Sequence, residues 1–482
     1  MADPEPRYSF DPLERRGVLL GLQPAQLLTL GVVALLAFAA DRSLGRSGQP
    51  VGLLILTAGV ASAVWTRGGR PASTWFVELV AWVVRRARGP LLDERPLHGT
   101  LDSGRPSRAA GARSLEKTVP SGVELAELSA EPGSIAILLD RRDRRWIAVL
   151  PVKGGSFALL DPEDQARRLE GWRVTLNSLG RPGTAVRRVQ WIQRSHPGVA
   201  AGVVHGSASV HSGATSTVAV ESYRALVLEA KPSQHHESWI AIAVDGPPSS
   251  GSAAGRRAEQ VLRRELRLLE GQLRNADLQP SAPLDRARLA STIGGAYEAP
   301  AERPVGAGCW EHSSPWPVAE DEQWSYLRSG GSCHATYWIA DWPRIEVGPD
   351  FLMPLLMGEG RRTVSLVMEP VPPERAAREV RSARTADAAD EQLRSRAGFL
   401  PSARRGREAE GVMRREAELA EGHAEFRYSG YVTVHAADRE SLDLACAEAE
   451  HAAQASQLEL RRLYGRQHEA FTWTLPLARG LR

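Results

Sequence analysis

LLTLGVVALLAFAA (Leu27–Ala40) and VGLLILTAGVASAVW (Val51–Trp65) are the most apolar stretches of this 482-residue sequence. They lie inside two uncharged runs of 24 and 20 residues, Gly17–Ala40 and Ser47–Thr66. Each run is long enough for a helix that crosses a hydrocarbon core, which takes ~20 residues. A short glycine-containing loop joins the runs. We therefore predict an N-terminal two-helix transmembrane hairpin, with spans at about 19–40 and 47–66.

The charges around these runs predict the orientation of the hairpin. Residues 1–92 carry 10 arginines and 6 acidic residues, whereas the whole chain has a net charge of +3. Most of these arginines flank the hairpin on the side of its two ends, which the positive-inside rule places in the cytoplasm. The sequence thus predicts a multi-pass protein of the cell membrane with both termini cytoplasmic. The alternative is a pair of buried core helices in a soluble protein.

A third apolar segment, STWFVELVAWVVRRARG (Ser73–Gly89), follows the hairpin. Its large side chains recur at helical spacing, and arginines end it, so we predict a helix over 73–89. Such a helix fits the membrane interface, where tryptophan rings and arginines meet the headgroups. An equally good interpretation is a helix packed on the soluble body. The predicted membrane-interface residues are Trp65, Trp75, Trp82, Arg85, Arg86 and Arg88.

The remainder of the chain predicts a cytoplasmic α+β body of two mixed α/β modules. Residues 93–121 lack apolar periodicity and are predicted to be a linker. The first module covers 122–300, with a loose Gly- and Ser-rich insertion at 198–217. The second covers 301–482. Strands and helices alternate without a regular βαβαβ series, which favours α+β.

Several elements of the body are predicted individually. A hairpin is expected from Ser134–Asp140 and Arg144–Val152, and a helix over Asp161–Gly180 that Asp161 caps. A second helix, Arg256–Asn275, is expected to place Leu262, Leu266, Leu269 and Leu273 on one face, and a strand is expected at Thr363–Pro370. Two arginine- and glutamate-rich helices are expected at about 373–396 and 404–422. The end of the chain is predicted to form a long helix, Arg439–Tyr464, and a last strand, Ala470–Leu475.

Two short segments resemble a phosphate-binding loop and a serine-lysine catalytic motif, but neither has the residues that the motif needs. Gly111–Thr118 (GARSLEKT) places Glu116 where a phosphate loop needs glycine before its lysine, and no strand precedes it. Ser114 and Lys117 match a serine-lysine spacing, but the companion motifs of that enzyme class are absent. We therefore predict no catalytic and no cofactor-binding residue.

The positions of the cysteines and histidines give little support for a catalytic or metal-binding site. Cys333 and His334 are neighbours on a predicted strand, so they point to opposite faces and cannot form a nucleophile–base pair. His235 and His236 fall in a predicted polar turn, and His205 and His211 give only a weak metal signal in the insertion. We therefore predict no metal site. The charged helices contain few aromatic residues, so we do not expect direct nucleic-acid binding.

Five segments resemble a family of PrgI-like membrane proteins from actinobacterial conjugation or type IV secretion-like gene clusters. They are RRGVLLGLQPAQLLTLG (Arg15–Gly31), DPEDQARRLEGWRVTLNSLGRPGTAVRRVQWIQR (Asp161–Arg194), YWIADWPRIEVGPDFLMPLL (Tyr337–Leu356), REAELAEGHAEFRYSGYVTV (Arg415–Val434) and LRRLYGRQHEAFTWTLPLARGL (Leu460–Leu481). In this family the hairpin resembles the small two-span subunit of type IV machines. The body resembles the non-motor domain of the conjugation ATPase.

The resemblance implies a non-enzymatic, membrane-anchored scaffold that docks a separate motor ATPase. It also implies other membrane subunits as partners and self-association within a complex. The segment Arg439–Arg482 is expected to face the ATPase, because fused relatives continue there into a motor domain. Two alternatives stand beside this prediction: a type VII secretion component of the EccE kind, and a membrane-tethered hydrolase.

Overall fold

The structure is a computed structural model in which three N-terminal helices and most of the body are described. The described residues are Phe10, 24–44, 48–64, 66–67, 70–87, 122–130, 133–155, 157–197, 234–248, 252–298, 315–317, 319–396 and 403–481. The predicted linker 93–121 and insertion 198–217 lie outside them, as do the sequence motifs at Gly111–Thr118 and the histidines His205 and His211.

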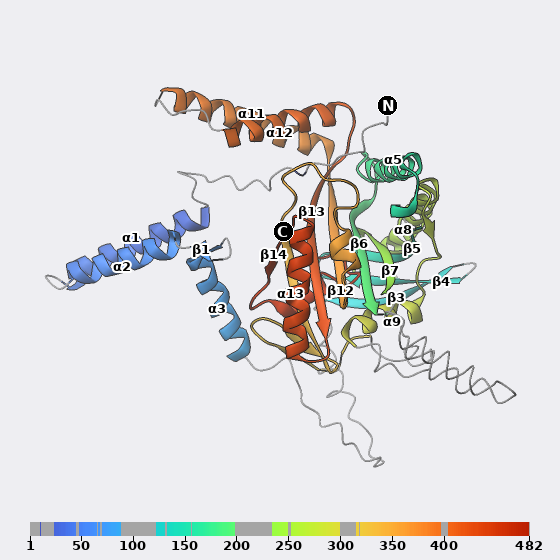
Figure 1. Ribbon diagram of the computed structural model, residues 1–482, viewed down its shortest axis with the longest axis horizontal. Coiled ribbons are helices and arrows are strands. Elements are labelled where there is room, and N and C mark those ends of the chain that lie inside the picture. The colour runs from blue at the N-terminus through green and yellow to red at the C-terminus, as the bar shows by residue number, and fades with distance from the viewer. Residues whose placement is uncertain are drawn as a thin grey trace, which may run out of the picture.

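One antiparallel sheet of 12 strands forms the centre of the body (Figure 1). Its order is β3-β4-β5-β7-β6-β12-β13-β11-β10-β9, with β14 paired to β11 and β8 paired to β5. This confirms the predicted α+β class. The strands are β3 (Val123–Ala130), β4 (Gly133–Asp140), β5 (Arg145–Lys153), β6 (Val186–Pro197), β7 (Gln234–Asp245), β8 (Gln279–Pro280), β9 (Glu320–Glu322), β10 (Leu327–Ser329), β11 (Ser332–Asp341), β12 (Arg361–Val371), β13 (Glu425–Ala436) and β14 (Glu459–Arg462).

The helices surround this sheet and extend from it. They are α1 (Pro24–Leu44), α2 (Gly48–Val64), α3 (Ala72–Ala87), α5 (Pro162–Leu179), α8 (Ala253–Asn275), α9 (Arg286–Tyr297), α10 (Met353–Met357), α11 (Pro373–Arg396), α12 (Ala403–Ala420), α13 (Arg439–Ala455) and α14 (Gln467–Thr472). A two-stranded ribbon, β1 (Thr66–Arg67) and β2 (Arg70–Pro71), connects α2 to α3.

The body repeats one topology twice. The series β5-α5-β6-β7-α8-β8 has the strand order β8-β5-β7-β6, and the series β11-α10-β12-β13-α13-β14 has the order β14-β11-β13-β12. Both are β-α-β-β-α-β units of the split, ferredoxin-like kind. The second strand of each unit, β6 or β12, pairs antiparallel with its counterpart, with Ile192 opposite Ser365. The two units therefore share one continuous sheet.

The two faces of the sheet are covered differently. On one face α5 and α8 pack over the first unit, and α10 and α13 pack over the second. The predicted stripe of α8, Leu262, Leu266, Leu269 and Leu273, is buried there, as its spacing requires. On the opposite face α9 and the C-terminal segment, residues 467–481, cover the sheet with Phe471 and Leu475.

The structure confirms the predicted positions of the hairpin β4–β5, the helix α5 and the charged helices α11 and α12. Asp161 precedes α5, but its side chain makes no capping hydrogen bond. The prediction of a long helix Arg439–Tyr464 was wrong. The helix ends at Ala455, Gln457 takes φ 57°, and the chain returns as β14. The predicted last strand Ala470–Leu475 was also wrong, because α14 occupies its first half.

The N-terminal helices differ from the predicted spans in their bounds. Helix α1 begins at Pro24 and continues past Ala40 through Asp41 and Arg42 to Leu44. Helix α2 has 17 residues. Within the described ranges, no helix combines the length and the apolarity that crossing a membrane demands.

Candidate functional site

Helices α1 and α2 pack side by side and project away from the sheet (Figure 1). Two buried glycines seven residues apart, Gly52 and Gly59, face α1. A Cβ at Gly52 would lie 2.9 Å from the carbonyl oxygen of Ala37, and one at Gly59 would lie 2.2 Å from Val33 Cγ1. The two backbones therefore approach as closely as glycine allows, a feature common between helices in apolar surroundings.

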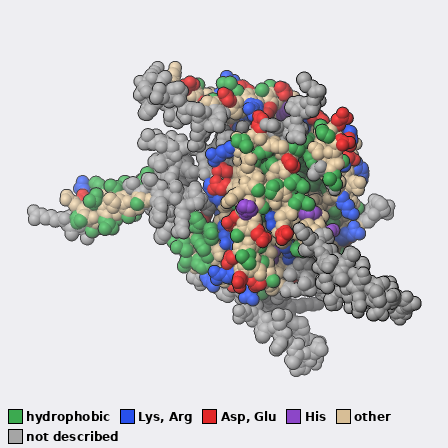
Figure 2. Space-filling model, viewed as in Figure 1, with side chains coloured by type: hydrophobic (Ala, Val, Ile, Leu, Met, Phe, Trp, Pro, Cys, Tyr) green, Lys and Arg blue, Asp and Glu red, His purple; other side chains and the backbone are tan. Residues whose placement is uncertain are grey.

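The outward surface of this helical pair is apolar on many sides. Leu35, Leu53 and Leu54 are 70%, 63% and 68% exposed. Val32, Leu36, Phe38, Val51 and Leu56 are also exposed. Figure 2 shows these helices as a largely hydrophobic projection, in contrast to the charged surface of the body. Such a contiguous apolar surface marks a site of contact with lipid or protein.

Helix α3 lies against the body through aromatic side chains. The ring of Trp75 is tilted against that of Tyr464, with ring centroids 5.3 Å apart, and its centroid lies 6.4 Å from that of Trp324. Trp82 meets Trp324 edge-on at 5.5 Å. Trp324 and Tyr464 come from the loops after β9 and β14, so α3 is held by the far edge of the second unit. Each ring pair contributes ~0.5–1.5 kcal/mol beyond its buried area.

The arginines at the end of α3 reach the same edge. Arg85 donates a hydrogen bond to the carbonyl oxygen of Gly465 and lies 3.9 Å from Glu322. Arg86 donates to the carbonyl oxygen of Glu322 at 3.2 Å and lies 3.9 Å from Asp321. Burial raises the pKa of Glu322, although the backbone N–H of His468 and the charge of Arg85 oppose that shift. These ion pairs orient the C-terminal end of α3 on β9.

Of the predicted membrane-interface residues, four are described. Trp75, Trp82, Arg85 and Arg86 all contact the body, which corresponds to the second interpretation of this helix, packing on protein. The side chains of Arg85 and Arg86 remain 47% and 51% exposed, so headgroup contact by these two stays a prediction. Trp65 and Arg88 lie outside the described residues.

The C-terminal segment 467–481 is fastened to the sheet by buried polar groups. Gln190 Nε2 donates to Ser365 Oγ and to the carbonyl oxygens of Trp473 and Leu475, at 2.8–3.0 Å. Gln190 Oε1 accepts from the backbone N–H of Ala478 at 2.7 Å. Residues 471–478 are consequently buried. Within the predicted ATPase-facing segment, the outer side of α13 is exposed at Asp443, Leu444 and Glu448.

Cys333 and His334 point to opposite faces of β11, as predicted. Cys333 packs in the helix-covered core, and burial raises the pKa of its thiol. His334 lies on the other face, where its Nδ1 is 2.8 Å from Nδ1 of His435. Burial and the charge of Arg361 lower the pKa of His334 to about 3. This pair is therefore a neutral element of the core at physiological pH.

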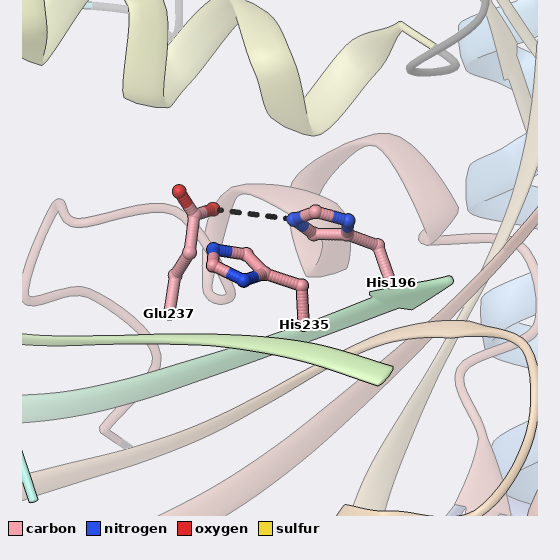
Figure 3. A group of neighbouring side chains, drawn as sticks. All are labelled: His196, His235 and Glu237. Carbon is pink, nitrogen blue, oxygen red and sulfur yellow. Dashed lines mark ion pairs between the residues drawn. The ribbon is translucent and has the colours of Figure 1, made fainter. Parts of the chain in front are cut away.

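A histidine group that the sequence analysis did not anticipate lies where β6 ends and β7 begins. His235 and His236 were placed in a polar turn, and this was wrong because β7 already starts at Gln234. His196 and His235 are cross-strand neighbours, and Glu237 lies two residues along the same face. Figure 3 shows the three side chains gathered on one side of the two strands. The signal available in the sequence was the alternation His235-x-Glu237, which has the period of a strand.

No protein-family model matches the chain, and no curated protein matches it. The function proposed below therefore rests on the surfaces and contacts of the chain and on the resemblance of its segments.

Proposed function

We propose that this protein is a non-enzymatic scaffold that the α1–α2 hairpin anchors in a membrane. The observation that carries the proposal is the ring of exposed leucine, valine and phenylalanine side chains around that hairpin. Exposed apolar area costs ~25 cal/mol per Å² in water, and lipid removes that cost. The body has an ordinary charged surface, and the neighbouring helix α3 adds four exposed apolar side chains, Leu79, Val80, Val83 and Val84.

The packing inside the hairpin supports the same proposal. Lipid provides no hydrophobic force between helices, so membrane helices associate through small residues that allow close contact. Gly52 and Gly59 provide that contact. The 17 residues of α2 rise ~25 Å, a few ångströms less than a hydrocarbon core of ~30 Å. A mismatch of this size is absorbed by local thinning of the bilayer at modest cost.

The anchor can be tested with charges placed on its outward surface. The full chain is expected to stay in the membrane pellet after extraction at high pH with carbonate. The double variant Leu35→Arg/Leu54→Arg is expected to be released, because each arginine at bilayer depth costs ~2.5–3.5 kcal/mol. Leu159→Arg and Leu444→Arg are the matched controls, since both leucines are exposed on the body, 84% and 66%.

Two results would contradict the anchor. One is release of the unchanged chain by carbonate. The other is retention of the double variant in the pellet to the same extent as the controls.

We further propose that the scaffold works in a type IV secretion-like or conjugative complex and docks a separate motor ATPase. The ground is the resemblance to PrgI-like proteins. The exposed surface for docking is the outer side of α13, with Asp443 and Glu448, and the paired helices α11 and α12, which extend from the body (Figure 1).

Affinity purification from native membranes in mild detergent tests the partner. Recovery of a motor ATPase is expected with the unchanged chain and is expected to fall with Leu444→Arg, which changes the centre of the α13 surface. Leu159→Arg is the control. Recovery of type VII core subunits in place of the ATPase would refute this part of the proposal.

A further inference from the structure

The group formed by His196, His235 and Glu237 has the composition of a metal-binding site. One ligand atom from each residue lies within 4.8 Å of the others. The ring centroids of His196 and His235 are 5.0 Å apart, and His196 Nε2 lies 3.9 Å from Glu237 Oε2. All three side chains rise from one face of paired strands (Figure 3).

The strands hold the ligands in register. His196 lies directly opposite His235, and Glu237 lies two residues further along β7, so all three point the same way. The neighbouring His236 points to the other face and pairs its Nδ1 with Ser195 Oγ at 2.9 Å. Because side chains alternate between the two faces of a strand, His196, His235 and Glu237 share one face and His236 lies on the other.

The environment of His196 suits a ligand. Its Nδ1 lies 3.4 Å from the carbonyl oxygen of Pro197, which leaves Nε2 directed toward Glu237. Metal-binding histidines commonly donate the other ring N–H to a carbonyl in this manner, which sets the tautomer.

We propose that His196, His235 and Glu237 bind a divalent transition-metal ion of the zinc class. Two imidazoles and a carboxylate are a ligand set that Zn²⁺ accepts, with further positions left for water. Ligand atoms around such an ion lie about 3.4 Å apart for bonds of ~2.1 Å. Closing from the observed separations takes small side-chain rotations by His235, which is exposed, and by Glu237.

One nearby charge opposes a cation, because the guanidinium of Arg361 is close enough for its charge to act on His196. That guanidinium donates hydrogen bonds to the carbonyl oxygens of Gly295 and Glu298 at the end of α9. The carboxylate of Glu237 supplies the compensating negative charge in the group.

The position of the site gives the ion a structural role. The chain leaves β6 after Pro197 and enters β7 at Gln234, so an ion held by His196 and His235 would tie the two ends of the intervening residues together. Closing a long loop with a metal stabilises the folded state by restricting the unfolded chain. The ion would act as a clamp where β6 ends and β7 begins.

Zinc binding to the untagged full chain, stripped with chelator and kept in detergent, tests the proposal. Titration with Zn²⁺ against a chromophoric chelator is expected to show one saturable site per chain. His235→Ala and Glu237→Gln are expected to weaken it about 100-fold, at the upper end of the 10–100-fold that lost supporting contacts cost at metal sites. Co²⁺ is expected to give visible absorption bands that both variants lose.

Two controls make the outcome decisive. His451→Ala removes an exposed histidine on α13 and is expected to leave binding unchanged. The double variant His205→Ala/His211→Ala changes the other histidines between the strands and is also expected to bind normally. Three results would each overturn the proposal. They are loss of binding in that double variant, full binding by His235→Ala, and the absence of a saturable site in the unchanged chain.

Discussion

Gln190 shows how a single buried amide joins the C-terminal segment to the sheet. Its side chain has no exposed surface and uses both ends, donating to two carbonyl oxygens and Ser365 and accepting from Ala478. An apolar side chain of similar size cannot form these hydrogen bonds. If such a side chain replaced Gln190, polar backbone groups of the C-terminal segment would be buried without partners, which costs ~1–3 kcal/mol per group.

We therefore predict that Gln190→Leu lowers the free energy of unfolding by about 2–4 kcal/mol. Denaturant unfolding in a constant detergent measures the change. Gln454→Leu, at an exposed position of α13, is the matched control and is expected to stay within ~0.5 kcal/mol of the unchanged chain. A loss no larger than that of the control would show that the amide is not needed.

The buried pair His334–His435 predicts a pH dependence. Burial, together with the charge of Arg361, lowers the pKa of His334 to about 3 and also lowers that of His435. In the unfolded chain each histidine takes up a proton near pH 6.5. Below that pH the unfolded state binds more protons, so stability falls as the pH decreases from 6.5 toward 3.

His334→Gln removes one of these titrations. We expect the slope of unfolding free energy against pH, between 6.5 and 4, to decrease by up to ~1.4 kcal/mol per pH unit. His451→Gln, at an exposed position, should leave the slope unchanged. Equal slopes for the two variants would contradict a neutral buried His334.

Among the elements, α3 depends on one tryptophan of the body. Trp324 contacts both Trp75 and Trp82 of the helix, and it also stacks near Tyr464. We expect Trp324→Ala to weaken docking by about 2 kcal/mol, or roughly 30-fold in the undocked population. Hydrogen exchange of the α3 amides measures this.

Trp342→Ala provides the control for that experiment. Trp342 packs against Phe351 and Tyr428 in the core of the second unit, away from α3. Its loss should destabilise the body without selectively accelerating exchange in α3. If both variants change α3 equally, the helix is coupled to the whole body and not held by Trp324.

The α1–α2 pair depends on Gly59. A side chain there would overlap Val33, and overpacking of this kind costs ~1–3 kcal/mol. We expect Gly59→Leu to separate the two helices, which accelerates hydrogen exchange of the α1 and α2 amides. Ala61→Leu, at an exposed position of α2, should leave that exchange unchanged. Unchanged exchange in Gly59→Leu would contradict the close packing.

At the scale of the whole molecule, the two βαββαβ units unfold together because β6 and β12 join them in one sheet. Seven residue pairs connect these strands, from Arg362–Ser195 to Met368–Val189. A proline at Gln193 removes a ladder hydrogen bond and costs ~3 kcal/mol or more. We expect Gln193→Pro to accelerate hydrogen exchange in β5 and β11 by the same factor.

The edge strand β3 supplies the control. Glu127 is exposed on that strand and pairs with Ala136. Glu127→Pro should accelerate exchange in β3 and β4 alone. If Gln193→Pro affects only the first unit, the two units are independent in spite of the shared sheet.

The sequence patterns were most informative where periodicity was strong. The leucines of α8 and the apolar runs of β4, β5 and β12 lie where their spacing predicted. The end of α13 was missed, because the apolar spacing continues through Leu460 and Leu463 while Gln457 turns the backbone out of the helix. The final segment 470–475 was given as a strand because short apolar runs do not distinguish strand from helix.

Local periodicity and composition were enough to predict the α+β class, the order of most elements and the apolar N-terminal pair. Three features could not be read from local patterns: the sheet that the two units share, the packing of α3 on Trp324 and Tyr464, and the meeting of His196 with His235 and Glu237. These features depend on strand pairing and packing, which join residues far apart in the chain. His196 and His235 are separated by more than thirty residues, and only the register of β6 against β7 brings their rings within 5.0 Å.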